Sequence, residues 1–443
     1  MVQENQGKPL LLQEFKVKGY KNLTHSIVFG PLGRINVIHG ENNVGKSNLL
    51  QAIDLYFRLL ERWSQFDGRS VGAITIEPHA FEEWGFSSAE SFGFADPIPI
   101  ELTGTFSFTS EEREQLGLET SERLQVIELR LSLRANGVQA RITDLVGGIT
   151  EPALARILDY VPTVHLLQAR ETTSRFGLLG VSRRLATGTA QTNGLRIVSQ
   201  RLRDALFDAK ESREATLVRR WELFVEAMKQ FGVVLGPGGF DTAFDRQSGH
   251  ADLVFDSGEM RVPVDLLGSG VQQIVALLGQ LLLTPATLVG IEEPELNLRY
   301  TLQKQLLSAF QEITQSEHGP EQLFLTSHSP AFEAEESFFA MEYRGGVPIL
   351  NRKPRSLARV FTATQDQEDL YPEMHARRPE PVCYVSSEGL VMLPKDVRQT
   401  LGVGQGGGVS FIPNRDTNRF ELWTTDEVER WLAGDSGDGD ESK

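Results

Sequence analysis

Cysteine is almost absent from this chain of 443 residues, which contains Cys383 alone. A single cysteine excludes an internal disulfide framework and a zinc site built from several cysteines. Long apolar runs are also missing. The nearest candidate, residues 274–283, is too short to span a bilayer and includes Gln280. Residues 1–8 are polar and lack the apolar core of a signal peptide. We therefore expect a cytoplasmic protein without a membrane segment.

Basic residues are outnumbered by acidic ones. The chain has 44 Lys and Arg against 60 Asp and Glu, a formal net charge of −16. This balance argues against a protein that holds nucleic acid by bulk charge alone, although a local basic groove remains open. Apolar residues make up 40% of the chain, enough for an ordinary globular core, and the length suggests two to three domains.

Hydrophobic periodicity predicts an α/β protein. Strands are expected at residues 11–18, 23–29 and 34–39, followed by a helix after Lys46. Short alternating runs at 98–108, 124–133 and 138–142 predict an antiparallel meander with a helix at 110–116. A buried strand is expected at 161–167, and residues 193–232 predict a helical insertion, either one long helix or a hairpin. A helix at 266–283 with strands at 288–291 and 323–326 implies a parallel sheet.

The segment from Gly40 to Ser47 fits the phosphate-loop pattern G-x-x-x-x-G-K-[ST] between an apparent strand and a helix. Glycines let the backbone turn tightly, so that successive N–H groups can point at phosphates near the helix N-terminus. Lys46 would neutralise the β- and γ-phosphate oxygens, and the Ser47 hydroxyl would ligate Mg²⁺. Gly40, Asn43 and Gly45 complete the predicted nucleotide-binding loop.

Two acids end the apolar strand at 288–291. Parallel strands deliver side chains to the carboxyl edge of a sheet, where nucleotide phosphates lie. Of the two, Glu292 can hold the Mg²⁺ shell, while Glu293 can orient or deprotonate a water molecule.

Two further motifs follow the same logic. Gly268, Ser269, Gly270 and Gln272 open a buried helix, where a hydroxyl and backbone N–H groups form an anion site; alone, this would be an ordinary helix cap. His328 stands at the tip of the strand at 323–326, and a lone histidine is more often structural.

These motifs, in this order, resemble the ABC-type ATPase heads of the SMC/RecF/OLD group over roughly residues 11–343. The resemblance implies that residues 40–47 are the Walker A loop and residues 268–272 the signature motif. Glu292 then matches the Walker B acid on Mg²⁺, Glu293 the catalytic glutamate, and His328 the switch histidine that senses the γ-phosphate. In that family two heads dimerise head-to-tail around ATP, and each signature motif completes the other protomer's site.

The chain departs from the family pattern in two places. Arg299 and Tyr300 stand where a histidine-proline pair is common, and the insertion at 193–232 is too short for long coiled-coil arms. Arg170 and Arg175 either reach a phosphate or DNA or are surface arginines, and Gln168 is a candidate Q-loop glutamine.

The ATPase head is expected to span residues 1–345, followed by a linker at 346–380 and an acidic tail at 426–443. Between them, residues 381–425 resemble the AbrB/MazE-like swapped-hairpin domain, an interleaved dimer that usually binds DNA. Glu388 and Leu390 stand where that family has basic or polar residues. Because an acid there would repel phosphate, we expect dimerisation or partner docking rather than operator recognition.

Two functions remain open. In the first, the chain is an ATP-hydrolysing switch, a homo-oligomer that acts as sensor or scaffold for a separate effector protein. Heads like this one without a fused Toprim nuclease often work in bacterial anti-phage defence, and the resemblance implies that context. In the second, the chain is a DNA-binding ATPase in repair or transcriptional regulation, with DNA-stimulated, salt-dependent turnover.

Overall fold

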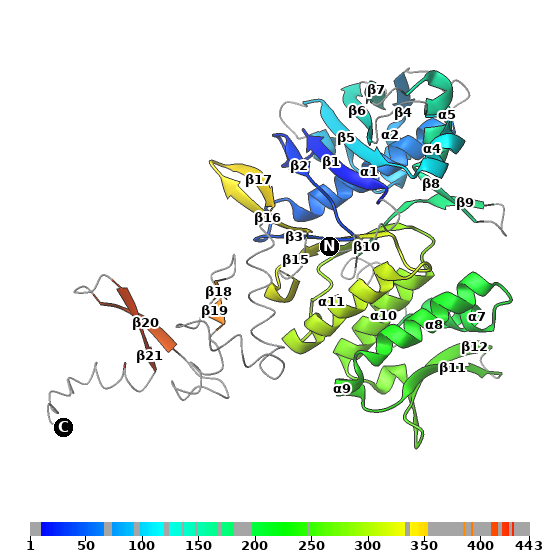
Figure 1. The fold of residues 1–443 in the computed structure, drawn as a ribbon, viewed down its shortest axis with the longest axis vertical. Helices are drawn as coiled ribbons and strands as arrows, with labels where there is room; N and C mark the ends of the chain where they lie inside the picture. Colours follow the sequence, from blue (N-terminus) through cyan, green and yellow to red (C-terminus); the bar gives the residue numbers. More distant parts are fainter. Residues whose placement is uncertain are drawn as a thin grey trace, which may run out of the picture. The chain divides into compact units, whose positions relative to one another are not determined.

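The computed structural model of the chain divides into two compact units, residues 1–355 and 356–443. Figure 1 colours its elements along the sequence. The structure describes residues 10–65, 73–92, 98–118, 124–134, 137–146, 149–166, 171–180, 197–246, 249–332, 337–352, 384–385, 391–392, 409–414, 419–424 and 428. No helix in this described part is long and apolar enough to cross a membrane.

A six-stranded sheet of order β10-β14-β15-β3-β16-β17 forms the centre of the first unit. Its strands are β3 (Ile35–His39), β10 (Phe176–Gly180), β14 (Leu288–Glu292), β15 (Gln322–Ser327), β16 (Ser337–Arg344) and β17 (Val347–Arg352). All neighbours are parallel except β16 and β17. The predicted parallel sheet is confirmed, and the strands expected at 34–39, 288–291 and 323–326 belong to it.

Two hydrophobic cores lie on opposite faces of this sheet, which explains why its strands are apolar at successive positions. Ile38 and Phe324 pack in a core with α1 (Lys46–Ser64). Val37 and Leu323 pack in the other core with α10 (Ser269–Leu283) and α11 (Tyr300–Gln315). In Figure 1 these helices lie on either side of the central strands.

An antiparallel sheet of order β2-β1-β5-β6-β7-β4 closes the α1 side. Its strands are β1 (Leu12–Lys18), β2 (Ile27–Phe29), β4 (Ala73–Ile76), β5 (Ile100–Ser107), β6 (Leu124–Arg134) and β7 (Gly137–Val146). The helices along its connections are α2 (Pro78–Glu83), α3 (Ser88–Phe92), α4 (Ser110–Leu116) and α5 (Glu151–Tyr160). The predicted meander is confirmed, and α4 has the predicted bounds because Thr109 and Glu112 form a capping box at its start.

The strand expected at 161–167 is β8 (Thr163–Leu166), which pairs antiparallel with β9 (Glu171–Ser174) in a separate two-stranded ladder. It therefore lies outside the central sheet. The short 3-10 turn η2 (Pro330–Phe332) follows β15.

The helical insertion is a hairpin. Its helices are α7 (Gln200–Glu211) and α8 (Ala215–Lys229), and α9 (Gly232–Leu235) follows. The single-helix alternative is wrong because the backbone leaves the helix at Ser212, where it is extended. A three-stranded sheet comes next, with β11 (Gly239–Asp245), β12 (His250–Asp256), β13 (Arg261–Pro263) and the 3-10 turn η1 (Val264–Leu266).

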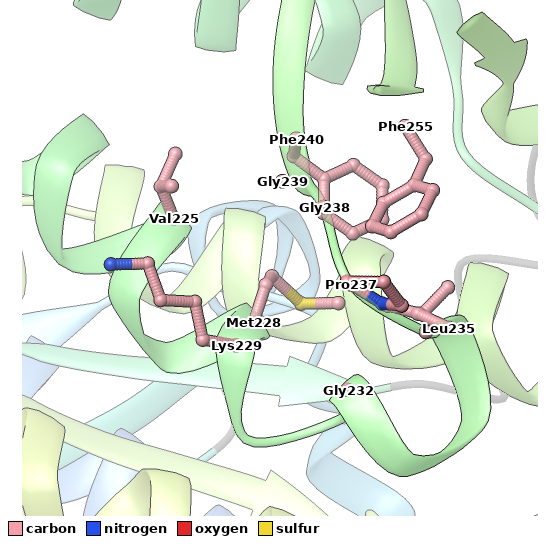
Figure 2. Close-up of a pocket in the computed structure, with 11 residues that line it drawn as sticks. Val225, Met228, Lys229, Gly232, Leu235, Pro237, Gly238, Gly239, Phe240 and Phe255 are labelled. Carbon is pink, nitrogen blue, oxygen red and sulfur yellow. The ribbon is translucent and has the colours of Figure 1, made fainter. Parts of the chain in front are cut away.

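A cavity of about 290 Å³ lies among α8, α9 and the β11–β12 hairpin. Figure 2 shows the rings of Phe240 and Phe255 on one side of it and Met228 and Lys229 on the other. The two rings meet edge to face at 5.5 Å.

The expected head boundary at 345 falls inside a hairpin, because β17 continues from β16 in the central sheet. Residues 347–352 of the expected linker at 346–380 form β17, and its residues from 353 on lie outside the described part. In the second unit, β18 (Tyr384–Val385) pairs with β19 (Val391–Met392), and β20 (Val409–Asn414) pairs with β21 (Arg419–Thr424). Both pairs lie within residues 381–425. The swapped-hairpin dimer stays a prediction, and the expected tail lies outside the described residues except for Val428.

Candidate functional site

The predicted phosphate loop connects the end of β3 to the start of α1. Three of its residues have positive φ: Gly40 at 156°, Asn43 at 65° and Gly45 at 112°. Gly45 is the N-cap of α1 and has no side chain that could cap the first-turn N–H groups. A helix N-terminus of this kind can accept an anion on its backbone N–H groups.

Gly40 has a steric reason to be glycine. A Cβ there would lie 2.2 Å from the carbonyl oxygen of Met341 on β16. At Gly45 a Cβ would lie 2.8 Å from the Asn22 side-chain oxygen. The loop is thus packed against elements distant in sequence, and its shape depends on them.

Asn22 and Tyr343 brace the loop, and sequence reasoning missed both. The Asn43 carbonyl accepts hydrogen bonds from Asn22 Nδ2 at 3.3 Å and from the Tyr343 hydroxyl at 3.1 Å. Asn22 also accepts a bond from Asn48 Nδ2 at 2.8 Å. Because Asn22 and Tyr343 are 321 residues apart, no local pattern could pair them.

Lys46 is 6% exposed and points back into its own loop. Its ammonium donates to the carbonyl oxygens of Gly40 at 2.6 Å and Glu41 at 2.8 Å. It also lies 2.9 Å from His328 Nε2. The structure therefore brings the phosphate-loop lysine and the histidine at the end of β15 together, although the two residues are 282 positions apart in the sequence.

Glu293 joins the same cluster. Its Oε1 lies 3.2 Å from His328 Nε2. Its backbone has φ of 46°, a left-handed conformation uncommon for a side-chain-bearing residue, and its N–H donates to the Thr326 carbonyl at 3.0 Å. Strained backbone of this kind persists where surrounding structure over-determines it, often at functional sites.

Glu292 is the last residue of β14 and is 8% exposed. Among the described residues its Oε1 has no hydrogen-bond partner. A buried carboxylate oxygen without a donor is unfavourable, and a divalent cation is one group that would satisfy it. The chemistry of Glu292 therefore fits the predicted role toward Mg²⁺, as does the exposed hydroxyl of Ser47 at the start of α1.

Glu295 is a site residue to which sequence reasoning assigned no role. It is 8% exposed, and its Oε1 accepts from the Ser327 hydroxyl at 2.7 Å and the His328 N–H at 2.6 Å. Burial raises the pKa of this carboxyl, and its two hydrogen bonds oppose the rise. Its position two residues after Glu293 was the available signal.

Residues 268–272, the predicted signature motif, form a turn at the start of α10, which we call the signature turn. Gly268 and Ser269 are exposed, and Gly268 caps the helix without a side-chain hydrogen bond. Both amide hydrogens of Gln272 are used within this turn, because Nε2 donates to the carbonyl oxygens of Asp265 at 3.1 Å and Leu267 at 2.7 Å. A Cβ on Gly270 would lie 3.4 Å from Leu302 of α11.

Arg175 is neither a surface arginine nor a phosphate ligand in this structure. It is 8% exposed, and its guanidinium donates to the carbonyl oxygens of Tyr160, Val161 and Thr163 at 2.7, 2.8 and 3.0 Å. Both readings offered for it from the sequence are wrong, because these three carbonyls and the Tyr160 ring at 4.8 Å surround its charge. Arg170 and Gln168 lie outside the described residues.

Three solved structures illustrate what the fold is similar to. The first is the Smc head bound to the C-winged helix domain of ScpA, with 16% sequence identity, coverage of 78% of this chain and 98% of that chain, and a TM-score of 0.47. The second is the Smc head of Pyrococcus furiosus with an extended coiled coil, bound to the C-terminal domain of ScpA, with 14% identity, coverage of 80% of this chain and 99% of that chain, and a TM-score of 0.46. The third is the SMC head domain from Thermotoga maritima, with 13% identity, coverage of 78% of this chain and 99% of that chain, and a TM-score of 0.42. No curated protein matches the chain.

A family model matches residues 35–145 and 182–334, which is more than half of the chain. The matched ranges include the phosphate loop, the signature turn, both acids of β14 and His328. The chain belongs to the AAA ATPase family described as "AAA domain, putative AbiEii toxin, Type IV TA system".

Proposed function

We propose that this chain is an ATP-binding and ATP-hydrolysing switch that dimerises head-to-tail and acts as sensor or scaffold for a separate effector. One observation carries the proposal: Lys46, Glu293 and His328 meet at the carboxyl edge of the parallel sheet, beside the buried Glu292. Ligands of open α/β sheets bind at that edge.

Lys46 and Glu293 compete for the same atom, Nε2 of His328. A histidine Nε2 accepts a hydrogen bond when it carries no proton and donates one when it does. Toward the Lys46 ammonium at 2.9 Å it must accept, whereas toward Glu293 Oε1 at 3.2 Å it must donate. A phosphate that binds Lys46 removes one competitor and frees Nε2. His328 is thereby placed to respond to the presence of the phosphate.

Mg²⁺ would be held by Ser47 and Glu292 together with phosphate oxygens. When bound, it supplies positive charge that stabilises the phosphates during their displacement. The buried, unsatisfied Oε1 of Glu292 supports this assignment.

Glu293 is the proposed base. Hydrolysis forms a bond from a water oxygen to the γ-phosphorus and breaks the bond between that phosphorus and the oxygen bridging to ADP. The Glu293 carboxylate orients the water and takes its proton. The backbone of Glu293 is fixed for this task by its N–H bond to Thr326.

The head-to-tail dimer rests on the signature turn. Its exposed Gly268 and Ser269 present backbone N–H groups and a hydroxyl at the start of a helix of 15 residues. The hydrogen bonds of Gln272 stay within that turn and do not reach the phosphate loop of the same chain. We therefore infer that the signature turn contacts the nucleotide bound by a second protomer. The family's description as a putative toxin of a type IV toxin–antitoxin system supports a role in bacterial defence with a separate partner protein.

Steady-state Mg²⁺-ATP hydrolysis over a range of protein concentrations tests the proposal. We expect specific turnover to rise with concentration. We expect Glu293→Gln to lower turnover about a hundredfold or more, because it removes the base, and to retain nucleotide binding. Lys46→Ala should lose nucleotide binding, and Glu317→Gln, a change at an exposed acid, is the matched control.

Turnover that is independent of concentration would contradict the composite site, and unchanged turnover in Glu293→Gln would contradict the assigned base. Duplex DNA added at several salt concentrations tests the alternative function. Stimulation that falls steeply with salt would favour a DNA-binding ATPase over the sensor.

A further inference from the structure

Arg203 of α7 is buried and carries a charge the proposed reaction does not use. It is 2% exposed. Its guanidinium donates to Asp252 of β12 at 2.8 Å and to Asp265 of η1, and also to the Val198 carbonyl at 3.0 Å. A buried guanidinium with several fixed acceptors holds its neighbours in one geometry.

Asp265 connects this ion pair to the signature turn. It stands three residues before Gly268. While its carboxylate accepts from Arg203, its backbone carbonyl accepts from Gln272 Nε2 at 3.1 Å. Gln272 Nε2 also donates to the Leu267 carbonyl oxygen at 2.7 Å. A continuous set of hydrogen bonds thus runs from Arg203 to the first turn of α10.

The rest of α7 is fixed to the same elements. Gln200 donates to the Ala251 carbonyl at 2.6 Å, and the Ala251 N–H donates to Asp204 at 2.9 Å. A Cβ on Gly279 of α10 would lie 3.3 Å from Leu202, so α7 packs closely on the signature helix. A change in the position of α7 must therefore move the signature turn or break these contacts.

We propose that Arg203 is a positioning residue that couples the α7–α8 hairpin to the signature turn through Asp265. This inference rests on the proposed head-to-tail function. Arg203 holds residues 265–272 in the orientation that completes the nucleotide site of a second copy of this chain.

The two acids that contact Arg203 give a matched comparison. Asp265 accepts a hydrogen bond from Gln272 of the signature motif, whereas Asp252 belongs to β12, and their side chains are 28% and 38% exposed. Asp265→Asn and Asp252→Asn each remove one charge from the same guanidinium. A purely stabilising ion pair predicts similar effects for both, whereas coupling predicts that Asp265→Asn alone disturbs the signature turn.

The experiment measures nucleotide affinity in dilute protein and the protein concentration that gives half-maximal ATP turnover. We expect Arg203→Met and Asp265→Asn to raise that concentration about tenfold, a usual size for coupling between sites, at unchanged nucleotide affinity. Asp252→Asn and Arg201→Met, a change at an exposed neighbour on α7, should behave as wild type. Equal effects of Asp252→Asn and Asp265→Asn would overturn the proposal.

Hydrogen exchange of the amides in residues 265–272 gives a second readout that needs no ATP. Faster exchange in Arg203→Met and Asp265→Asn, but not in Asp252→Asn, supports the coupling, and unchanged exchange refutes it. If wild-type turnover shows no dependence on concentration, the head-to-tail function fails while the exchange result still decides the role of Arg203. Should Arg203→Met fail to fold, Asp265→Asn decides, because it preserves the side-chain shape and the backbone carbonyl.

Discussion

Glu295 holds the backbone from which His328 projects. Its carboxylate accepts from the Ser327 hydroxyl and from the His328 N–H, so removal of either bond would loosen the turn after β15. Gln303 extends the support, since its Oε1 accepts from the Ser329 hydroxyl at 2.5 Å. His328 is thus positioned by contacts to its backbone, while its ring lies beside Lys46 and Glu293.

The raised pKa of Glu295 has a consequence for stability. Burial places it above the ordinary value of 4.5, so the folded protein binds this proton more tightly than the unfolded chain. The free energy of unfolding therefore falls as pH rises from that value through the folded pKa. We expect the free energy of unfolding of Glu295→Gln not to show this decrease with pH, because glutamine keeps an acceptor for Ser327 and His328 and never ionises.

Chemical denaturation of both proteins from pH 4 to 8 measures the effect. Acids with lowered pKa, such as Asp241 beside Lys210, act in the opposite sense but are common to both proteins. The informative quantity is the difference between the two curves. A difference that stays constant across the range would mean that Glu295 does not titrate as inferred.

At the scale of elements, the phosphate loop was predictable because its signal is local. Strand, glycine turn, lysine and helix all lie within residues 34–60, and β3 and α1 form there. The meander was predictable for the same reason, since its strands alternate and neighbour one another along the chain. Glu292, Glu293 and His328 could be placed because parallel strands share one carboxyl edge.

The missed features depend on distant partners. Tyr343 reaches the phosphate loop only because β16 pairs with β3, about 300 residues away. Arg175 was misread because its acceptors are carbonyls, and a carbonyl leaves no signal in the sequence. Likewise, β10 was not recognised as the neighbour of β14.

Arg175 joins the end of α5 to β10, and its loss should weaken that junction. We expect Arg175→Met to lower the free energy of unfolding by about 3 kcal/mol, because it leaves buried carbonyls without donors. Nucleotide affinity should not change. Denaturant titration and nucleotide binding check both statements, with the exposed Arg130→Met as control. Lost affinity at full stability would restore a phosphate-binding role.

At the scale of the whole molecule, the candidate site belongs to one unit. Every residue of the site, and both hydrophobic cores, lies within residues 1–355. The second unit, residues 356–443, has its own strand pairs. The expected tail-mediated dimer would add a second association to that of the heads.

Deletion of residues 356–443 tests this division. We expect maximal turnover to be unchanged, since the site and its cores remain. The protein concentration for half-maximal turnover should rise, because tethering through the second unit raises the effective concentration of heads. Turnover assays and sedimentation of both proteins measure the two effects. An unchanged concentration dependence would contradict dimerisation through the second unit.

The position of β3 between β15 and β16 also bears on how the protein is made. Residues 35–39 leave the ribosome early, but their neighbours in the sheet are residues 322–327 and 337–344. Pairing over such separations is slow and must await synthesis of the later strands. A nascent chain that stops before β16 carries the whole phosphate-loop motif without one of the strands that shape it. The phosphate loop can therefore reach the packing described above only after β16 has been synthesised, because Gly40 lies against the Met341 carbonyl of that strand.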